Sequence, residues 1–211
     1  MELTQALKKL AEGSVKRHPG KAQEIMHDAI VSLRETAILD KAYKAGDILP
    51  NIALPNAKGE NVRLYDLLES QKVVIIFYRG GWCPYCNLEL KAFQKSLPDF
   101  KAKGAQLIAI SPELPDHAVT TSEKNELSFQ VLSDVNNELA KQMHLLYPLP
   151  DEIVSLYLKF GINLETSQGN LANSLPIAAT YIVEQDGKIS YAFLEEDYKL
   201  RADPEEVLRQ L

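Results

Sequence analysis

The sequence predicts an α/β fold: a mixed β-sheet flanked by helices, with a helical extension at the N-terminus. From residue 73 to residue 143, short apolar runs rich in β-branched residues alternate with segments of helical periodicity. Such alternation is typical of strands that are joined through helices. Near the C-terminus, Asp186-Gly187 separates two strand-like runs and predicts a β-hairpin, which adds antiparallel pairing to the sheet.

The first 45 residues predict two helices. Their apolar residues recur at helical spacing in two runs, which Pro19-Gly20 separates. The runs are Leu3, Leu7 and Leu10, followed by Ile25, Ile30, Leu33 and Ala37. An apolar stripe must be covered, either by the rest of the chain or by a second subunit. We expect an arm, residues 1–45, that docks on a domain formed by residues 46–211.

The central strand and the helix after it are the clearest local features. Residues 46–59 are rich in turn residues, and residues 64–70 are long enough for one or two helical turns. A buried strand is predicted at 73–78, followed by a Gly-Gly turn. The next helix opens with Pro84, because proline fits the first position of a helix. This helix is expected to run as far as Pro98, which ends or kinks it.

The rest of the alternation predicts two strands and two helices. The strands are expected at 105–110 and 129–132. Asp116 and Asp134 each stand where an acidic side chain caps a helix N-terminus, and a helix is expected after each of them, the second running as far as Met143.

The C-terminal third departs from this alternation. Residues 145–176 contain three prolines and two glycines and predict an insertion. The hairpin at residues 180–193 follows. Asp203 then caps a final helix, with Pro204 at its first position and Glu206 reaching back to the cap. This order of elements is the layout of a thioredoxin-type fold.

Length and composition limit the classes of function. With 211 residues, 45% of them hydrophobic, the chain can form one full core with an appendage. The formal net charge of −6 argues against a nucleic acid or an anionic membrane as partner, because both attract basic surfaces. The N-terminus lacks the apolar core of a secretory signal, and no apolar run is long enough to cross a membrane. The two cysteines share one motif, which is typical of a reducing compartment, so we expect a cytoplasmic protein.

Cys83 and Cys86 lie at the junction between the predicted central strand and the helix, three residues apart. A thiol at a helix N-terminus lies close to unpaired N–H groups and to the positive end of the helix dipole, and both favour the thiolate. One helical turn also brings the two sulfurs close enough to form a disulfide without a large backbone movement. The geometry predicts a dithiol redox couple, in which one cysteine attacks and the other resolves.

A zinc site is the alternative interpretation of a C-x-x-C pair. A structural zinc site needs four ligands, and the chain has no second cysteine pair. The four histidines are scattered and show no ligand spacing; they are His18, His27, His117 and His144. We expect no metal and no cofactor.

The residues around the cysteine pair resemble a known family. Phe77-Tyr78 is followed eight residues later by Cys86, with Glu89 three residues beyond it. This spacing resembles the peroxiredoxin block in which Phe-Tyr leads through Pro-x-x-x-Thr-x-x-Cys to a glutamate. Four other segments resemble further blocks of that family in the same order: Gly46-Asp-Ile-Leu-Pro, Ile108-Ala-Ile-Ser, Leu132-Ser-Asp, and Thr180-Tyr-Ile-Val with Asp186-Gly187.

Over about residues 46–145 and 176–211, the chain is similar to the peroxiredoxin-like branch of the alkyl hydroperoxide reductase and thiol-specific antioxidant family. That branch is marked by Trp-Cys-Pro-x-Cys, which occurs here as Trp-Cys-Pro-Tyr-Cys. The resemblance implies a thioredoxin-like fold of the peroxiredoxin type and peroxidase chemistry.

Three positions depart from the family pattern. Arg79 stands where the family has proline, and Cys83 where it has the threonine that hydrogen-bonds the peroxide. Ala178 stands where peroxiredoxins tend to have an active-site arginine and where thioredoxins have a cis-proline. Arg201 and its neighbours resemble a C-terminal block of the branch, but the sequence gives no mechanism for them.

The order of attack has two competing interpretations. The resemblance to peroxiredoxins makes Cys86 the attacking residue. The position at the helix start, and the likeness to the Cys-Pro-Tyr-Cys motif of glutaredoxins, make Cys83 the more exposed and more acidic thiol. The spacing from Phe77 to Glu89 favours Cys86 as attacker, with Cys83 resolving.

Five other residues are candidates for a role. Arg79 is predicted to stabilise the thiolate and polarise the peroxide, or else to face solvent at the strand end. Trp82 and Tyr85 are expected to wall the site and present a surface to a reducing partner, or only to pack. Thr180 is expected to hydrogen-bond near the sulfurs from the facing loop, or to be an ordinary strand threonine. Glu89 is expected to lie on the helix surface or in an ion pair.

The leading prediction is a thiol-dependent peroxidase that reduces hydrogen peroxide or alkyl hydroperoxides through Cys83 and Cys86. A thiol of the thioredoxin or glutathione type is the expected reductant, and the predicted arm is compatible with a homodimer. Two alternatives stay open. One is a thioredoxin- or glutaredoxin-like dithiol-disulfide oxidoreductase, and the other is a non-catalytic module whose two cysteines hold a metal at a subunit interface.

Overall fold

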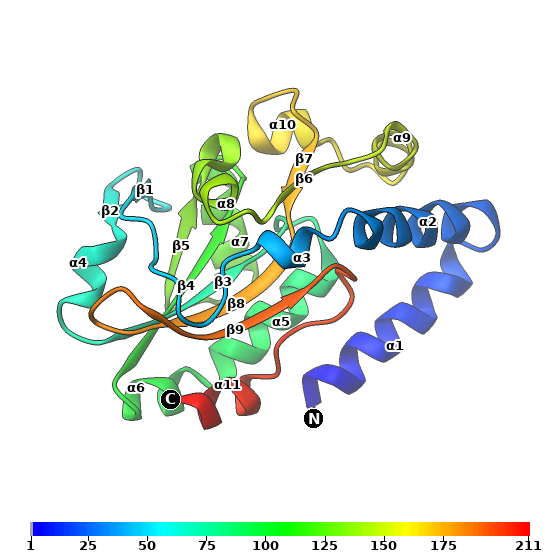
Figure 1. Cartoon of the computed structure of the whole chain (residues 1–211). Coiled ribbons are helices and arrows are strands. Elements are labelled where there is room, and N and C mark those ends of the chain that lie inside the picture. Colours follow the sequence, from blue (N-terminus) through cyan, green and yellow to red (C-terminus); the bar gives the residue numbers. More distant parts are fainter. Residues whose placement is uncertain (1) are drawn as a thin grey trace.

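A five-stranded mixed sheet forms the centre of the molecule, as the computed structural model of residues 2–211 shows (Figure 1). The strand order is β5-β4-β3-β8-β9. β3 pairs in parallel with β4, and β4 with β5, whereas β8 is antiparallel to both β3 and β9. The strands are β3 (Lys72–Phe77), β4 (Ala105–Ser111), β5 (Gln130–Ser133), β8 (Ala178–Val183) and β9 (Ile189–Glu195). The predicted mixed sheet and the C-terminal hairpin are confirmed.

The central strand β3 is buried on both faces because its alternate residues supply two separate cores. Val74 and Ile76 pack into one core, and Val73, Ile75 and Phe77 pack into the other. Besides the N-terminal arm, the helices that contribute to the first core are α5 (Pro84–Lys95), α6 (Leu97–Ala102), α7 (Pro115–Lys124) and α11 (Pro204–Gln210). Those that contribute to the second core, again besides α2 (Lys21–Glu35), are α3 (Ile38–Lys41), α4 (Leu64–Leu68) and α8 (Glu138–Gln142).

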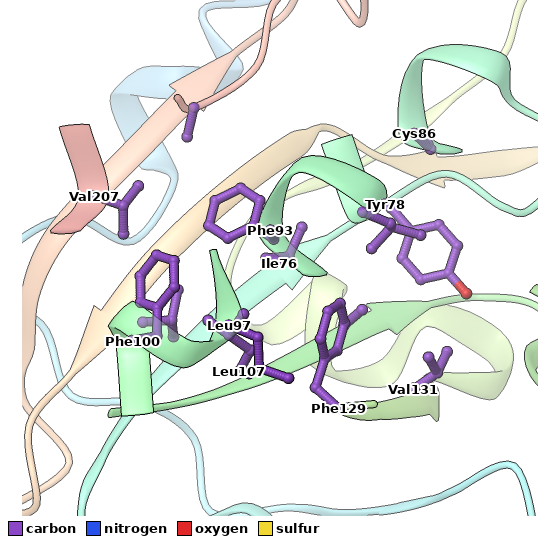
Figure 2. Packing of buried hydrophobic residues seen from close by; sticks show 14 of the residues in the cluster. Ile76, Tyr78, Cys86, Phe93, Leu97, Phe100, Leu107, Phe129, Val131 and Val207 are labelled. Carbon is purple, nitrogen blue, oxygen red and sulfur yellow. The ribbon is translucent and has the colours of Figure 1, made fainter. Parts of the chain in front are cut away.

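Aromatic side chains hold the redox helix α5 against the sheet (Figure 2). The rings of Phe93 and Phe100 stack with centroids 5.6 Å apart, and both side chains are fully buried. Cys86 lies at the N-terminal end of the same cluster, beyond Phe93 along the helix. Because closely packed aromatic residues leave little freedom to move, the sulfur of Cys86 is held in a fixed position.

The local signals around α5 act as predicted. Cys83 has an extended backbone and stands directly before the helix, and Pro84 occupies its first turn. α5 ends at Lys95, and α6 begins at Leu97 with Pro98 in its first turn. The break between the two helices therefore falls at Ser96, and Pro98 lies in the first turn of α6, where a proline is tolerated.

The N-terminal arm forms the two predicted helices, α1 (Glu2–Arg17) and α2 (Lys21–Glu35), which lie beside the sheet in Figure 1, and the short helix α3 follows them. Leu3 and Leu7 of α1 pack into the core that contains α5, whereas Leu33 at the end of α2 packs into the core on the other face. Met26 joins a third cluster, which is shared with α9 (Asp151–Lys159). The apolar stripe of the arm is covered by the chain itself.

The predicted insertion, residues 145–176, leaves the sheet and returns to it. β6 (Leu146–Pro148) pairs antiparallel with β7 (Ser174–Pro176), and α9 and α10 (Leu164–Gln168) lie between these strands. In Figure 1 these two helices stand on the same side of the sheet as α2. The segment before the central strand contains a small hairpin of β1 (Ala53–Pro55) and β2 (Asn61–Arg63), and a 3₁₀ turn (Val135–Asn137) precedes α8.

Three predicted caps have different outcomes. Asp134 accepts backbone N–H bonds from Leu139 and Ala140 and so satisfies donors at the start of α8, as predicted. Asp116 is not a cap, because Pro115 opens α7 one residue earlier and places Asp116 inside the first turn.

At α11, Asp203 accepts from the N–H of Glu205 at 3.0 Å, as a cap should. Glu206 does not reach back to it, since its carboxylate instead contacts Arg209 and Gln210 one turn further along.

The Gly80-Gly81 turn gives a first testable prediction. A Cβ atom on Gly81 would lie 2.0 Å from Oγ1 of Thr121, so Gly81→Ala must displace either the turn or α7. We expect a loss of about 1–3 kcal/mol in the free energy of unfolding, measured by urea denaturation. Gly81→Ala combined with Thr121→Ala should recover part of the loss.

Gly13→Ala is the matched control, because the nearest side-chain atom there is the flexible end of Arg17 and Gly13 lies inside α1. That change should be neutral or stabilising. Equal stability of Gly81→Ala and the parent protein would contradict the close packing of the turn.

Candidate active site

The two cysteines lie where β3 passes through the Gly80-Gly81-Trp82 turn into α5. Both are free thiols and both are buried, with 1% of Cys83 and none of Cys86 exposed. The exposed position that the helix-start argument gave to Cys83 is wrong, because the arm and the insertion cover the start of α5. Cys83 nevertheless lines a cavity of about 350 Å³, and Cys86 is not among the residues that line it.

Cys86 is surrounded by hydrogen-bond donors. Its sulfur lies 3.4 Å from the backbone nitrogen of Arg79 and 3.3 Å from Nη2 of Arg201. Arg201 also forms an ion pair with Glu89, whose Oε2 is 2.5 Å from Nη1. Glu89 is 1% exposed, so its expected place on the helix surface is wrong and its expected ion pair is confirmed.

Arg201 is the residue that sequence reasoning missed. It lies in the segment between β9 and α11, where its Nε and Nη2 donate to the backbone oxygen of Tyr198 at 3.0 and 2.8 Å. The guanidinium is thereby held against a sulfur 115 positions away in sequence. Two signals could have found it: Ala178 stands where an arginine was expected, and Arg201 belongs to a segment that resembles a family block.

Arg79 is a buried cation beside Cys83. It is 2% exposed, so its predicted solvent-facing alternative is wrong. Its Nη1 lies 4.0 Å from the sulfur of Cys83, and its Nη2 donates to the hydroxyl of Tyr157 on α9. The guanidinium lies 4.2 Å from the ring centre of Tyr198 and 5.1 Å from that of Trp82. Three aromatic rings therefore surround a charge that has no carboxylate partner within residues 2–211.

Trp82 and Tyr85 both line the cavity with Cys83, as expected. The ring of Trp82 lies 5.5 Å from that of Tyr157, and its indole N–H has no hydrogen-bond partner in the described chain. Tyr85 meets Tyr198 edge to face at 5.6 Å. Both side chains pack and also wall the cavity, so the two interpretations of them do not exclude each other.

Thr180 lies within β8, opposite Ile76, and not in a loop. Its side chain is fully buried and its hydroxyl has no hydrogen-bond partner in the described chain. The expected hydrogen bond near the sulfurs is therefore not formed in this structure.

A buried carboxylate fixes the turn before Cys83. Glu113 accepts from the N–H of Gly81 at 2.7 Å and from the hydroxyl of Ser167 in α10 at 2.9 Å. Burial raises the pKa of Glu113, although both hydrogen bonds oppose that rise. One side chain thus ties the redox turn to the predicted insertion.

Two further findings concern the described residues as a whole. Residues 2–211 contain no cluster of three or more His, Cys, Asp or Glu side chains arranged to hold a metal ion. Within the same range, none of the helices combines the length and the apolar character needed to cross a membrane.

The sequence profile of the AhpC/TSA family matches residues 45–192, more than half of the chain. The chain belongs to this family. Peroxiredoxin Bcp of Escherichia coli K12 is 28% identical over 169 residues, which cover 80% of this chain and 95% of that protein. A putative peroxiredoxin of Mycobacterium tuberculosis H37Rv is 30% identical over 147 residues, which cover 70% of this chain and 82% of that one.

Solved structures show the same fold. Peroxidoxin BcpB of Mycobacterium tuberculosis superposes with a TM-score of 0.62 at 21% identity, covering 79% of this chain and 95% of that one. A cysteine mutant of PrxQ from Xylella fastidiosa gives 0.63 at 20% identity, covering 79% and 93%. The predicted thioredoxin-like fold, the AhpC/TSA resemblance and the class of thiol peroxidase are confirmed. The arm lies almost entirely outside the matched range.

The two thiols of this AhpC/TSA protein differ in acidity. Burial raises the pKa of Cys83, but the hydrogen bond with Cys86 and the charges of Arg79 and Arg201 outweigh burial and lower it to about 5. Burial and the same hydrogen bond raise the pKa of Cys86, against the effect of Arg201. The two thiols share one hydrogen bond, so the pair as a whole loses its first proton more readily than an ordinary thiol.

Glu89 limits the positive charge that Arg201 brings to the pair. Burial raises the pKa of Glu89 to about 7, while the Arg201 guanidinium opposes the rise and Cys86 adds to it. The carboxylate is therefore only part-ionised near neutral pH, so it offsets only part of the effect that the fully charged Arg201 guanidinium has on the sulfurs.

Replacing Arg201 tests this arrangement. Arg201→Gln leaves the Glu89 carboxylate buried without its partner, so the free energy of unfolding should fall by about 3 kcal/mol in urea denaturation. It also removes a cation that lowers the pKa of Cys83, so thiol alkylation by iodoacetamide at pH 6 should slow.

Arg209→Gln, which changes an exposed arginine on α11, is the control and should alter neither quantity measurably. An Arg201→Gln protein with parental stability and parental alkylation rate would show that the guanidinium does not act on the pair.

Proposed function

We propose that this AhpC/TSA protein reduces hydrogen peroxide or alkyl hydroperoxides with Cys83 as the attacking thiolate and Cys86 as the resolving thiol. One observation carries the order of attack: Cys83 both lines the cavity and has the lowered pKa, whereas Cys86 does neither. This order reverses the one that the spacing of Cys86 favours. It agrees with the behaviour expected of the outer thiol at a helix start.

The proposed cycle has two steps. The Cys83 thiolate attacks one peroxide oxygen, the O–O bond breaks, and the other oxygen leaves as an alkoxide or hydroxide that takes a proton from solvent. Cys83 is then a sulfenic acid. The Cys86 thiol attacks its sulfur, and the Cys86 proton leaves with the hydroxyl group as water, which forms the Cys83–Cys86 disulfide.

The two arginines have different parts in this proposal. Arg79 lies 4.0 Å from the Cys83 sulfur at the cavity wall, where its charge stabilises the thiolate and the developing oxyanion of the peroxide. Arg201 lies at the Cys86 sulfur, where it stabilises the thiolate form that Cys86 passes through. Trp82 and Tyr85 wall the space that the peroxide enters.

The proposal includes the partners expected from the sequence. The oxidising substrate is a peroxide, and the reductant is a thiol of the thioredoxin or glutathione type; membership of the AhpC/TSA family and the similarity to peroxiredoxin Bcp support the peroxide. A cytoplasmic location is part of the proposal, since both cysteines are free thiols that must be returned to that state after each cycle. A homodimer is left as an expectation to be measured by sedimentation.

A dithiol-disulfide oxidoreductase is the second candidate, favoured by the low pKa of the first cysteine in a Cys-Pro-Tyr-Cys motif. One equivalent of peroxide given to the reduced protein separates the two functions. Loss of both free thiols within seconds supports the peroxidase. Persistence of both thiols for minutes, together with rapid reduction of insulin, would support the oxidoreductase instead.

Single serine variants test the order of attack. Cys86→Ser keeps the attacking thiolate and removes the resolving thiol, so peroxide should produce a sulfenic acid that dimedone traps in one equivalent. Cys83→Ser should react slowly and give little adduct, because the remaining thiol is buried and has a raised pKa. Mass spectrometry of the adducts is the measurement, and the opposite pattern would make Cys86 the attacker.

The pH dependence of oxidation tests the lowered pKa. Because the Cys83 thiolate is the nucleophile, the rate of reaction with hydrogen peroxide should be constant above pH 6 and should fall as the pH drops through about 5. Stopped-flow fluorescence of Trp82, the single tryptophan, reports the rate. Circular dichroism at each pH controls for unfolding. A midpoint near the ordinary thiol value of about 8.5 would refute the assignment.

A further inference from the structure

Arg79 depends on the oxidation state of Cys83 for its counter-charge. Its guanidinium is buried, its Nε has no hydrogen-bond partner within residues 2–211, and no carboxylate of that range pairs with it. In the reduced protein the Cys83 thiolate supplies a negative charge 4.0 Å away. Formation of the disulfide removes that charge, so a buried cation is then left without an anion.

Two cavities meet at this cation. One is the cavity of about 350 Å³ that Cys83 lines, and the other, of about 130 Å³, lies between α2 and the β6–α9 segment. Both are lined by Arg79, Tyr157 and Tyr198. A molecule in the larger cavity would therefore contact both the sulfur of Cys83 and the guanidinium.

The mouth of the larger cavity is basic. Arg17 and His18 at the end of α1 and Lys159 at the end of α9 line it, and no acidic residue of the described chain does. The nearby carboxylate of Asp197 is paired with Lys199 at 3.3 Å. This concentration of positive charge occurs in a chain whose formal net charge is −6. The mouth favours anions.

The walls and the size of the cavity favour a small molecule. Aromatic and aliphatic side chains line most of it, and its volume is within the range of small-molecule sites. Cys83 lines this cavity, so a small thiol bound inside it lies beside the sulfur. Arg17 and His18 precede the segment that the AhpC/TSA family profile matches, so the basic mouth is partly a feature of this chain's own extension.

We propose that this cavity binds a small thiol that carries carboxylates, and that this thiol reduces the Cys83–Cys86 disulfide. The inference rests on the proposed function, which creates that disulfide. The carboxylates contact Arg17 and Lys159 at the mouth, and Arg79 attracts the thiolate towards Cys83.

The thiolate attacks the Cys83 sulfur and the disulfide bond breaks, which releases Cys86 as a thiolate beside Arg201. A second thiolate then attacks the sulfur of the bound thiol and releases Cys83. Two thiols are oxidised to one disulfide, and the protein regains both of its thiols.

The test begins with the disulfide form made by diamide instead of peroxide, so that it does not depend on peroxidase activity. Glutathione is compared as a reductant with its diethyl ester, which has no carboxylates and keeps its positively charged amine, by stopped-flow fluorescence of Trp82. With rates expressed per thiolate, glutathione should react about tenfold faster at low salt, and the advantage should shrink towards 0.5 M salt. Equal rates for the two thiols would overturn the proposal.

Matched variants locate the effect. Arg17→Gln should slow glutathione about threefold and should not slow the diethyl ester, because one positive charge that attracts carboxylates is removed from the mouth. Lys16→Gln, which changes the neighbouring exposed cation that does not line the cavity, should slow neither thiol. Equal effects of the two variants would refute the assignment of the mouth.

A binding measurement tests how the charge of Cys83 affects the cavity. S-methylglutathione cannot react, and its carboxylates are repelled by the Cys83 thiolate of the reduced protein, so calorimetry should show it binding more tightly to the disulfide form. Equal affinity for both forms would refute the claim that the cavity binds anions better once the Cys83 thiolate is lost. If peroxide did not produce the disulfide but glutathione still reduced the diamide-made disulfide faster than the diethyl ester did, the proposed peroxidase activity would be refuted. The proposed thiol site would still be supported.

Discussion

Two buried guanidinium groups held against two sulfurs are the interaction on which this structure depends. Arg79 is 2% exposed and Arg201 is 6% exposed, and Glu89 is the one carboxylate of the described chain that is paired with either of them. Burying cations with so little compensating negative charge is unfavourable unless a further anion forms nearby. A thiolate on Cys83 is that anion. The reactivity of the pair therefore follows from the charge balance of its surroundings more than from the position of the motif alone.

Each part of this charge balance comes from a different region of the chain. Arg79 lies just after the central strand, Arg201 lies in the segment after the C-terminal hairpin, and Tyr157 lies in the insertion. The arm then closes the cavity from outside, since α1 packs against the core that contains α5 and contributes residues to the cavity mouth. Because Arg201 and Cys86 are 115 positions apart in sequence, and Arg79 and Tyr157 are 78 apart, the site forms only when distant parts of the chain have folded together.

The sequence predicted the parts of the site that depend on neighbouring residues, and it did not predict the parts that depend on residues far apart in the chain. The strand, the turn and the start of α5 depend on local signals such as Pro84 and the apolar run before it, and these were predicted correctly. The helices of the arm followed from apolar spacing. The burial of Cys83 could not be predicted, because it depends on where the arm docks. Arg201 was missed for the same reason: no local pattern indicates that a loop residue meets a sulfur 115 positions away.

Smaller errors have equally physical causes. Asp116 has the right side chain for a cap, but the backbone of Pro115 fixes the start of α7 one residue earlier. Of the two interpretations of Thr180, the strand threonine is the one that the structure shows, because the pairing of β8 with β3 places it opposite Ile76, where its hydroxyl is buried away from the sulfurs. In each case a local preference was identified correctly, and a neighbouring residue or strand decided the outcome.

The same charge balance also determines how easily the disulfide is reduced. Groups that stabilise the thiolate of Cys83 do not stabilise the disulfide to the same extent, so they shift the equilibrium towards the reduced pair. Lowering the pKa of Cys83 to about 5 therefore does two things at once: it supplies the nucleophile for the peroxide and makes the oxidised form a better electron acceptor. A buried cation such as Arg79 thus favours both halves of the cycle. Residues at strand ends often face solvent, but three aromatic rings enclose Arg79. Water therefore cannot screen the charge of Arg79.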